Sequence, residues 1–314
     1  MKTLFMFPGQ GAQSVGMGKE LAETITEVKE LYQKANEILG YDLAEICFEG
    51  PQEKLNLTEF AQPAIFVTSI AHLIALRQGI TSVELKDINP DACAGLSLGE
   101  YTALHVAGAI SFEDCLRLVQ LRGKGMQQAA EQSKGTMVSI LGMDEESVTR
   151  LCNDVLALNI TEDGGPAMLS PVNFNCPGQI VISGTLNACQ KAAELAGEYG
   201  AMKAIPLSVA GAFHTDMMAP AAEQLATAID SCTLNAPDSP VISNVDTLAY
   251  AGAGEIKEKL LKQLVGAVRW QQSVEKLMDD GFDSFVEIGP GRVLSGLVKK
   301  IGRNKKLKVN ITNV

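Results

Sequence analysis

The sequence has few of the residues that mark several common classes of function. Its 314 residues include only three histidines and one tryptophan, and 26 Lys and Arg stand against 37 Asp and Glu, a net charge of −11. Because no overall basic surface is available to meet phosphates, we expect no nucleic-acid partner. The seven cysteines form no C-x-x-C pair and have no histidine at metal-ligand spacing. We therefore expect buried thiols in a reducing cytoplasm, and no metal site.

Long hydrophobic segments are also lacking. No apolar run reaches the length of a membrane span, and the run near the amino terminus, LFMF, is too short for a signal peptide. We therefore expect a cytoplasmic protein with no membrane partner. Apolar residues make up 46% of the chain and charged residues 20%. This is the ordinary balance of a globular protein, and the chain is long enough for one large domain or two unequal ones.

Strands and helices alternate along the chain, which predicts an α/β fold. Apolar residues at helical spacing from 21 to 39 predict one amphipathic helix, a long apolar helix is expected after Pro63, and another is expected from about Phe112 to Gln132. Between roughly 135 and 205 the order reads β-α-β-β-α-β, the ferredoxin-like unit. We therefore expect a large α/β domain made of 1–130 and 206–314, with a ferredoxin-like subdomain inserted at 131–205.

One serine lies between two glycines where a short apolar strand turns into a helix, in the segment ACAGLSLGEY that contains Ser97. One interpretation is a nucleophile elbow, in which a tight turn strains the serine backbone and exposes the hydroxyl. The other is a helix N-cap, since serine is a preferred capping residue and Gly-x-Ser-x-Gly also occurs by chance. The pattern alone leaves both open.

A nucleophilic serine needs a base, and the chain offers His72, His105 and His214. His105 follows Ser97 by eight residues on the same expected helix, ~12 Å further along its axis, and is therefore out of reach. His72 lies inside a long apolar helix, where a structural role is the usual one. His214 follows an expected strand and begins a loop, the place where α/β folds carry functional groups. It is the candidate base, with a structural role as the alternative.

Arginine supplies a further candidate on the helix after the elbow. Arg122 falls on an apolar stripe with Cys115, Leu118 and Val119, whereas Arg117 points to the other side. A guanidinium on an apolar stripe is costly unless an anion meets it. The functional interpretation is a two-pronged clamp for a substrate carboxylate. The alternatives are a structural acidic partner or a side chain that extends to water.

The first turn, PGQGAQSVGMG, is rich in glycine but matches neither nucleotide-binding pattern. A dinucleotide fingerprint needs a third glycine where Ser14 stands, and a phosphate loop needs a lysine where Met17 stands. We still expect the backbone N–H groups of this turn to approach another group closely.

These segments together resemble one enzyme family over nearly the whole chain. The matching motifs, in order, are FPGQGAQSVGMG, GLSLGEYTAL, LRGKGMQ, VNFNCPGQIVISG, GAFHTDMM, SNVD, KQL and VEIGPGRVLSGL. They are similar to those of the malonyl-CoA:acyl-carrier-protein transacylases, the stand-alone acyltransferases of type II fatty-acid synthesis. The resemblance implies an α/β-hydrolase-like large domain with a parallel sheet and a smaller ferredoxin-like one.

The resemblance also implies roles for individual residues. Ser97 would be the acylated nucleophile, His214 its base and Arg122 the group that binds the malonyl carboxylate. The backbone N–H groups of Gln10 and Leu98 would form the oxyanion hole. The remaining residues implied to orient the histidine or to line the substrate pocket are Gln263, Met126, Phe213, Asn173 and Asn175.

One departure from the family pattern precedes the serine, where Leu96 replaces the usual histidine. The residue before an elbow nucleophile is expected to point away from the hydroxyl, so the catalytic interpretation stands while the shape of the acyl pocket is affected. The alternatives to a transferase are a serine esterase or thioesterase, and a non-catalytic carrier-protein binding module.

The implied substrates are malonyl-CoA and a holo acyl carrier protein, with no metal and no tightly held cofactor. Carrier proteins are acidic and so is this chain, which means that docking needs a local basic patch. Lys203, Lys299 and Lys300 are candidates for that patch, and a solvated helix face is the alternative for the last two. We expect a monomer.

Overall fold

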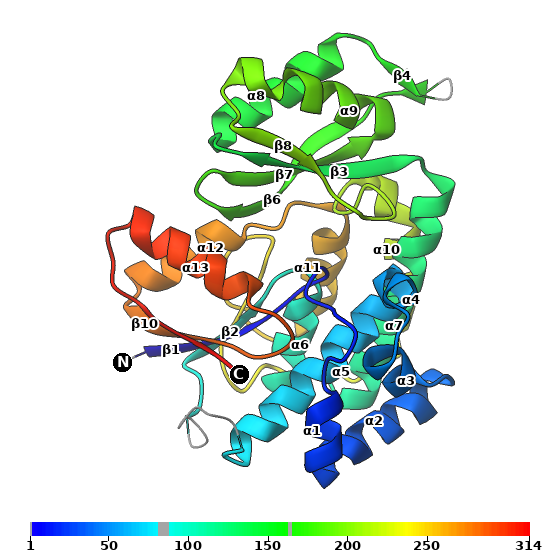
Figure 1. Ribbon diagram of the computed structural model, residues 1–314, viewed down its shortest axis with the longest axis vertical. Coiled ribbons are helices and arrows are strands. Elements are labelled where there is room, and N and C mark those ends of the chain that lie inside the picture. Colours follow the sequence, from blue (N-terminus) through cyan, green and yellow to red (C-terminus); the bar gives the residue numbers. More distant parts are fainter. Residues whose placement is uncertain (1, 81–87, 163–164) are drawn as a thin grey trace.

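The computed structural model describes residues 2–80, 88–162 and 165–314, which form a mixed α/β fold with a parallel sheet and a separate antiparallel sheet (Figure 1). The parallel sheet has the strand order β11-β10-β1-β2-β9. Its strands are β1 (Lys2–Phe7), β2 (Ala92–Gly95), β9 (Val241–Ile242), β10 (Phe282–Glu287) and β11 (Asn310–Asn313).

Helices cover both faces of the parallel sheet, as the alternation of side chains along β1 requires. Phe5 and Phe7 belong to a large buried cluster with the helices of one face, whereas Leu4 and Met6 pack with α12 (Trp270–Asp279) and α13 (Val293–Asn304) on the other. The helices that contribute to the first cluster are α2 (Thr26–Leu39), α3 (Leu43–Phe48), α4 (Gln52–Asn56), α5 (Thr58–Arg77), α6 (Leu98–Val106), α7 (Phe112–Gln132), α10 (Ala219–Asp230) and α11 (Ala253–Val265).

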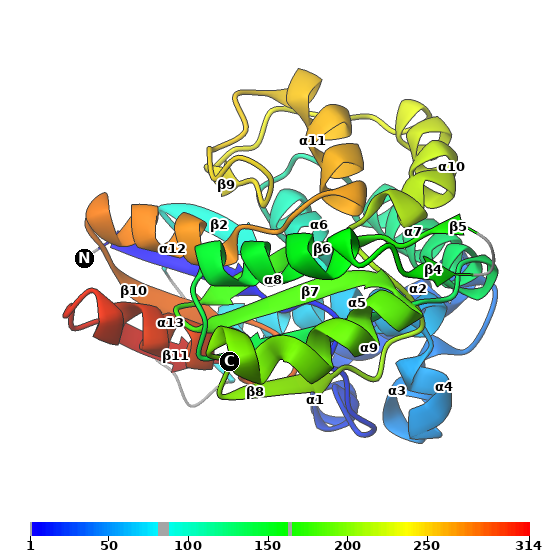
Figure 2. The same ribbon diagram turned by 90° about the horizontal axis from the view of Figure 1, so that it is seen from above.

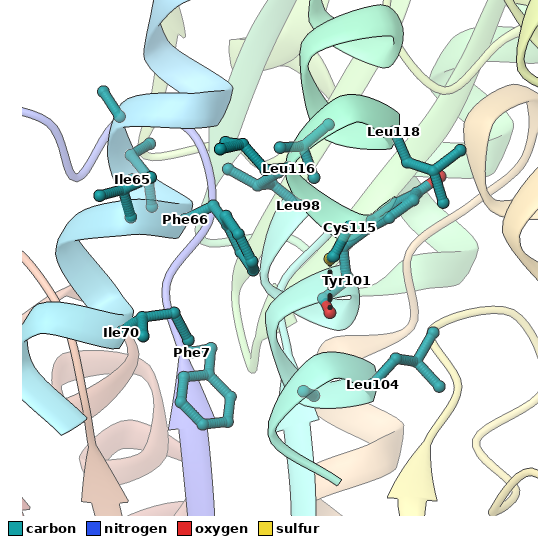
Figure 3. Close-up of a cluster of buried hydrophobic side chains, with 14 of the residues drawn as sticks. Phe7, Ile65, Phe66, Ile70, Leu98, Tyr101, Leu104, Cys115, Leu116 and Leu118 are labelled. Carbon is teal, nitrogen blue, oxygen red and sulfur yellow. Dashed lines mark hydrogen bonds between the residues drawn. The ribbon is translucent and has the colours of Figure 1, made fainter. Parts of the chain in front are cut away.

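Close packing between α5, α6 and α7 fixes the part of the core beneath the candidate serine. Figure 3 shows Phe66 of α5, Tyr101 of α6 and Leu116 of α7 among the side chains of this cluster, all of them fully buried. The Sγ of Cys115 donates to the backbone oxygen of Tyr101 at 3.4 Å, which ties α7 to α6.

The antiparallel sheet has the order β6-β7-β3-β8, and α8 (Glu145–Ala157) and α9 (Leu186–Leu195) pack on its outer face (Figures 1 and 2). Its strands are β3 (Gly135–Leu141), β6 (Leu169–Cys176), β7 (Gln179–Thr185) and β8 (Lys203–Pro206). The chain order is therefore β-α-β-β-α-β, with a two-stranded hairpin, β4 (Thr161–Glu162) and β5 (Gly165–Pro166), added before β6. Met137, Val172 and Val181 join the main core cluster, so the inner face of this sheet packs on the rest of the molecule.

Two expected helices differ in their bounds. The amphipathic helix between 21 and 39 is divided into α1 (Lys19–Thr24) and α2, because Ile25 adopts an extended conformation. The run of β-branched residues Thr24, Ile25 and Thr26 disfavours an unbroken helix there. The apolar helix begins at Thr58, before Pro63, so the proline lies inside α5.

The sequence expectation about membrane-length segments also needs correction. One helix, α5, is long and apolar enough to span a membrane by length and composition, but 72% of its most apolar window is buried inside the protein.

The expected helix from Phe112 to Gln132 and the expected strands of the antiparallel sheet are confirmed.

Candidate active site

Ser97 lies in a strained turn between β2 and α6. Its φ is 52° and its ψ −100°, and its side chain makes no capping hydrogen bond to the helix. A Cβ on Gly95 would lie 1.9 Å from the carbonyl carbon of Gly99, and a Cβ on Gly99 would lie 2.0 Å from the backbone oxygen of Phe7. Both neighbours must therefore be glycine for the turn to close. Ser97 thus occupies the position before α6 without capping it through its side chain, and the strained backbone is the one expected of a nucleophile elbow.

His214 is the histidine that contacts this serine. Its Nε2 lies 2.9 Å from Ser97 Oγ, and its Nδ1 lies 2.7 Å from the backbone oxygen of Gln263. A carbonyl only accepts, so Nδ1 carries the proton and Nε2 is free to accept one from the serine. Burial and then the positive charge of Arg122 lower the pKa of His214 to about 4. The ring is therefore neutral at pH 7, as a general base must be.

The other two histidines are bound elsewhere. His72 Nδ1 contacts the backbone oxygen of Val314 at 2.7 Å, and His105 Nδ1 contacts that of Ile110 at 2.9 Å. Burial lowers the pKa of both rings. Both histidines hold the backbone and make no contact with Ser97.

Arg122 of α7 is buried, with 1% of its surface exposed, and it also contacts the serine. Its Nη2 donates to Ser97 Oγ at 2.9 Å and to Gln263 Oε1 at 3.0 Å, and its Nη1 donates to Gln62 Oε1 at 2.8 Å. Its Nε has no hydrogen-bond partner. Among the described residues no carboxylate forms an ion pair with this guanidinium. By contrast, the side chain of Arg117 is 59% exposed.

The structural alternatives for Arg122 therefore fail on geometry. The side chain neither extends to water nor pairs directly with an acid. It is a desolvated cation held by neutral oxygens, an arrangement that favours an incoming anion.

Gln263 of α11 links the histidine and the arginine. The contact to His214 is made by its backbone carbonyl. Its side-chain Oε1 accepts from Arg122, while its Nε2 donates to the backbone oxygen of Ser97 at 2.7 Å and to Glu100 at 2.8 Å. Gln263 therefore contacts the imidazole through its backbone carbonyl and not through its side chain.

Four residues at the site were not found from the sequence. Gln62 holds Arg122, Asn244 Oδ1 accepts from the backbone N–H of Ser97 at 2.7 Å, and Tyr250 donates to the buried Glu100 at 2.5 Å. Glu100 carried a usable signal, since it is the one acidic side chain in the otherwise apolar segment of α6. Asn244 lies in the SNVD motif, which was matched without a role for this residue, and Gln62 carried no signal.

A cavity of about 380 Å³ opens over the serine and is lined by six of the ten expected site residues, but not by Arg122, Leu98, Gln263 or Asn175. Its polar lining includes Gln13, Asn56 and Ser208, and Leu96 also faces it, so the residue before the nucleophile shapes the cavity wall. The expected site residues in the lining are Gln10, Ser97, Met126, Asn173, Phe213 and His214.

Asn175 does not line this cavity, in contrast to the expectation for both asparagines of VNFN. It is buried, and its Oδ1 has no hydrogen-bond partner. The pairing of β6 is irregular between Phe174 and Cys176. Such an irregularity breaks the strict alternation that would have put Asn175 on the same face as Asn173.

The first glycine-rich turn packs against the elbow. A Cβ on Gly9 would lie 2.3 Å from the backbone oxygen of Leu96, so the two turns are in close contact. Leu98 is the first residue of α6, and its N–H therefore has no acceptor within the helix. Gln10 lines the cavity, and its side-chain Nε2 donates to Thr58 at 3.3 Å.

Within 2–80, 88–162 and 165–314, no cluster of His, Cys, Asp and Glu could hold a metal ion.

Comparison with known proteins confirms the resemblance found in the motifs. The acyl transferase domain model matches residues 4–311. A malonyl CoA-acyl carrier protein transacylase of Bacillus subtilis is 47% identical over 97% of this chain and 92% of its own length, and one of Haemophilus influenzae is 41% identical over 98% and 95%.

Solved structures agree with these relatives. An acyl carrier protein S-malonyltransferase of Vibrio cholerae has a TM-score of 0.89 and 40% identity, and covers 100% of this chain and 97% of its own. A malonyl-transacylase solved in complex with a type II polyketide-synthase acyl carrier protein has a TM-score of 0.90 and 38% identity, over 100% and 96%. The chain therefore belongs to the acyl transferase family, within the group of malonyl CoA-acyl carrier protein transacylases.

Proposed function

We propose that this chain transfers the malonyl group of malonyl-CoA to the phosphopantetheine thiol of an acyl carrier protein, through a malonyl-Ser97 ester, in fatty-acid biosynthesis. The observation that carries this proposal is a single serine hydroxyl hydrogen-bonded both to the neutral His214 and to the buried Arg122. The first contact suits acyl transfer and the second suits an acyl group that ends in a carboxylate.

In the first half-reaction, Ser97 Oγ attacks the thioester carbonyl while Nε2 of His214 takes the hydroxyl proton. The resulting oxyanion is stabilised by the backbone N–H groups of Gln10 and Leu98. The C–S bond then breaks, His214 returns the proton to the departing sulfur, and coenzyme A leaves as a thiol. In the second half-reaction the carrier-protein thiol attacks the ester, and the same groups act in reverse order.

Arg122 selects the acyl group. A guanidinium without a carboxylate partner in a desolvated pocket binds the free end of malonate in two-pronged fashion. A simple acyl chain would leave that charge unpaired, which is unfavourable. Phe213, Met126 and Asn173 line the rest of the acyl pocket.

The proposed chemistry uses only side-chain and backbone groups of this chain, so neither a metal nor a tightly bound cofactor is required. Within the same proposal we place the enzyme in the cytoplasm as a monomer. The division of the chain into 1–130 with 206–314, and 131–205, is supported by the two sheets. The hydrolase-like and ferredoxin-like descriptions are supported by the parallel order of one sheet and by the β-α-β-β-α-β order of the other.

The docking site for the carrier protein is proposed at exposed lysines. Lys299 and Lys300 are exposed in the middle of α13, and Lys203 is exposed on β8. Lys299 lines a surface hollow of about 630 Å³ together with Arg292, Arg303 and Lys308. This positive patch on an acidic protein favours contact with an acidic partner.

The proposal is tested by incubating the protein with malonyl-CoA and measuring the mass of the peptide that contains Ser97. Holo carrier protein or buffer is then added. A malonyl ester that is discharged rapidly only by the carrier protein supports the transferase. Rapid discharge in buffer would indicate a hydrolase, and an unmodified Ser97 would indicate a non-catalytic binding module.

Two variants test the covalent step. Ser97→Ala should abolish formation of the malonyl-enzyme, because it removes the hydroxyl that is hydrogen-bonded to Nε2 of His214. His214→Ala should slow it by ~10²–10⁴-fold, the usual contribution of a general base. Labelling of the Ser97→Ala protein at normal stoichiometry would contradict the proposed intermediate.

A further inference from the structure

Glu100 is a fully buried carboxylate that the proposed chemistry does not use. It lies one turn after Ser97 on α6, with none of its surface exposed. Its carboxylate accepts from the hydroxyl of Tyr250 at 2.5 Å, from Gln263 Nε2 at 2.8 Å and from the backbone N–H of Asn244 at 3.3 Å. Burying a carboxylate is energetically unfavourable even when three donors contact it, so Glu100 is expected to have a role at the site.

The first consequence of these contacts is the orientation of Gln263. A carboxylate only accepts, so the amide of Gln263 must turn its Nε2 towards Glu100. Its Oε1 then faces Arg122, at 3.0 Å from Nη2. Asn244, held by Glu100 through its backbone N–H, also accepts from the N–H of Ser97. The carboxylate of Glu100 therefore orients Gln263, which contacts Arg122, and holds Asn244, which contacts the backbone of Ser97.

The second consequence concerns charge. Glu100 and Arg122 are buried charges of opposite sign, separated by the amide of Gln263. The other titratable groups that face them are the hydroxyls of Tyr101 and Tyr250 and the imidazole of His214, whose pKa Arg122 lowers. Burial raises the pKa of Glu100 to about 7, while its hydrogen bonds and the charge of Arg122 act in the opposite direction. A second carboxylate on Arg122 would raise that pKa further, because like charges disfavour ionisation.

This inference rests on the proposed function. We propose that Glu100 is a positioning residue that holds the Gln263 amide towards Arg122, and that it takes up a proton from solvent when a dicarboxylic acyl group occupies the site. The proton is placed on Oε1, which faces the Tyr250 hydroxyl, a group that can turn and accept, so that Oε2 still accepts from Gln263 Nε2. The proton is released when the acyl group leaves on the carrier protein, so the complete reaction remains proton-neutral.

The test measures proton uptake during acylation with a pH indicator in weak buffer at pH 7. Acylation itself neither takes up nor releases a proton at this pH, because coenzyme A leaves as a thiol. The malonyl carboxylate would also raise the pKa of His214, which is lowered to about 4 in the free protein, and uptake that persists in Glu100→Gln would be assigned to that ring. Malonyl-CoA should cause net proton uptake that is greatest near neutral pH, because a group with a pKa of about 7 is only partly ionised there. Acetyl-CoA, which adds no carboxylate, should cause none.

Two variants separate this role from a purely structural one. Glu100→Gln should abolish the uptake and lower kcat/KM for malonyl-CoA at least tenfold more than for acetyl-CoA. Tyr250→Phe keeps the carboxylate but removes a hydrogen bond that lowers its pKa. It should therefore move the pH of greatest uptake upward, and this variant decides the matter if Glu100→Gln does not fold.

Unchanged uptake in Glu100→Gln, or an unchanged pH dependence in Tyr250→Phe, would overturn the inference. So would equal losses with malonyl-CoA and acetyl-CoA. If a malonyl-Ser97 ester forms in the unaltered protein without proton uptake, this inference fails and the proposed function stands. If no ester forms, the proposed function itself fails.

Discussion

Replacing Arg122 by alanine provides the sharpest separation between a malonyl transferase and a hydrolase. The change removes the three hydrogen bonds that the guanidinium donates to Ser97, Gln62 and Gln263. It also removes the charge that the malonyl carboxylate would meet in a site with 1% exposure. Loss of one partner of a buried ion pair costs ~3–5 kcal/mol. We therefore expect kcat/KM for malonyl-CoA to fall by about two to three and a half orders of magnitude.

Acetyl-CoA should respond differently to the same change. It presents no carboxylate, so it loses only the hydrogen bond from Arg122 to Ser97. Removing the positive charge also raises the pKa of His214, since Arg122 is one of the two causes that lower it. We expect acetyl transfer to fall less than tenfold, so that relative activity with acetyl-CoA rises. Arg122→Lys should recover malonyl transfer only in part, because an ammonium group cannot form the two-pronged contact.

The assay is transfer from each thioester to holo carrier protein, with thermal unfolding measured for every variant. Arg117→Ala is the matched control, because it removes an exposed arginine from the same helix and should leave both activities unchanged. Two buried acceptors lose their donor in Arg122→Ala, at ~1–3 kcal/mol each, so some loss of stability is expected. A proportional fall in malonyl and acetyl transfer with a lowered melting temperature would refute the carboxylate clamp.

Four further outcomes are expected. Because the pKa of His214 is lowered to about 4, the acid-side loss of acetyl transfer should be centred near pH 4, and a midpoint near 6.5 would contradict an imidazole buried in the neutral form. Because the pKa of His214 is lower in the folded protein than in the unfolded chain, the free energy of unfolding should fall as the pH drops from 6.5 towards 4. Urea unfolding between pH 4 and 7 can measure this fall. Reversing Lys299 and Lys300 to glutamate should weaken transfer to the carrier protein but leave acylation by malonyl-CoA nearly unchanged. The same change at the exposed Lys29 on α2 is the control and should affect neither half-reaction. Equal losses in both half-reactions would indicate misfolding or shared coenzyme A contacts. Phe213 lines the cavity beside the base, so malonyl-CoA should be preferred over methylmalonyl-CoA by ~10- to 200-fold in direct competition, the range that methyl-sized discrimination allows, and equal use of the two would remove Phe213 as a selective element.

Local patterns were sufficient to predict most of the elements and the principal site residues. The helix of α7 was predicted with its observed bounds, because its apolar residues recur at helical spacing between a serine cap and a break. The same periodicity placed Arg122 on the buried stripe. The glycines around Ser97 indicated a tight turn, and the small number of histidines left His214 as the candidate base, the one that the structure places against Ser97.

The tertiary structure alone decided which long-range partners hold these residues. Gln62 and Arg122 are 60 positions apart, and Gln263 and Ser97 are 166 apart. No periodic pattern along the chain reports such pairs, because periodicity shows only which face of one element is buried. Packing of the elements then determines what that face meets.

Two further points could be decided only from the fold: which backbone group contacts His214, and which of the two interpretations of Ser97 holds. The group that orients His214 is the backbone carbonyl of Gln263, which has no sequence signature. An elbow and an N-cap share the same residues at Ser97, and close contact of Gly95 and Gly99 with neighbouring backbone separates them. Sequence thus determined which residues could do chemistry. The packed structure determined the charge, tautomer and partners with which they do it, because these depend on burial and on atoms brought together from distant parts of the chain.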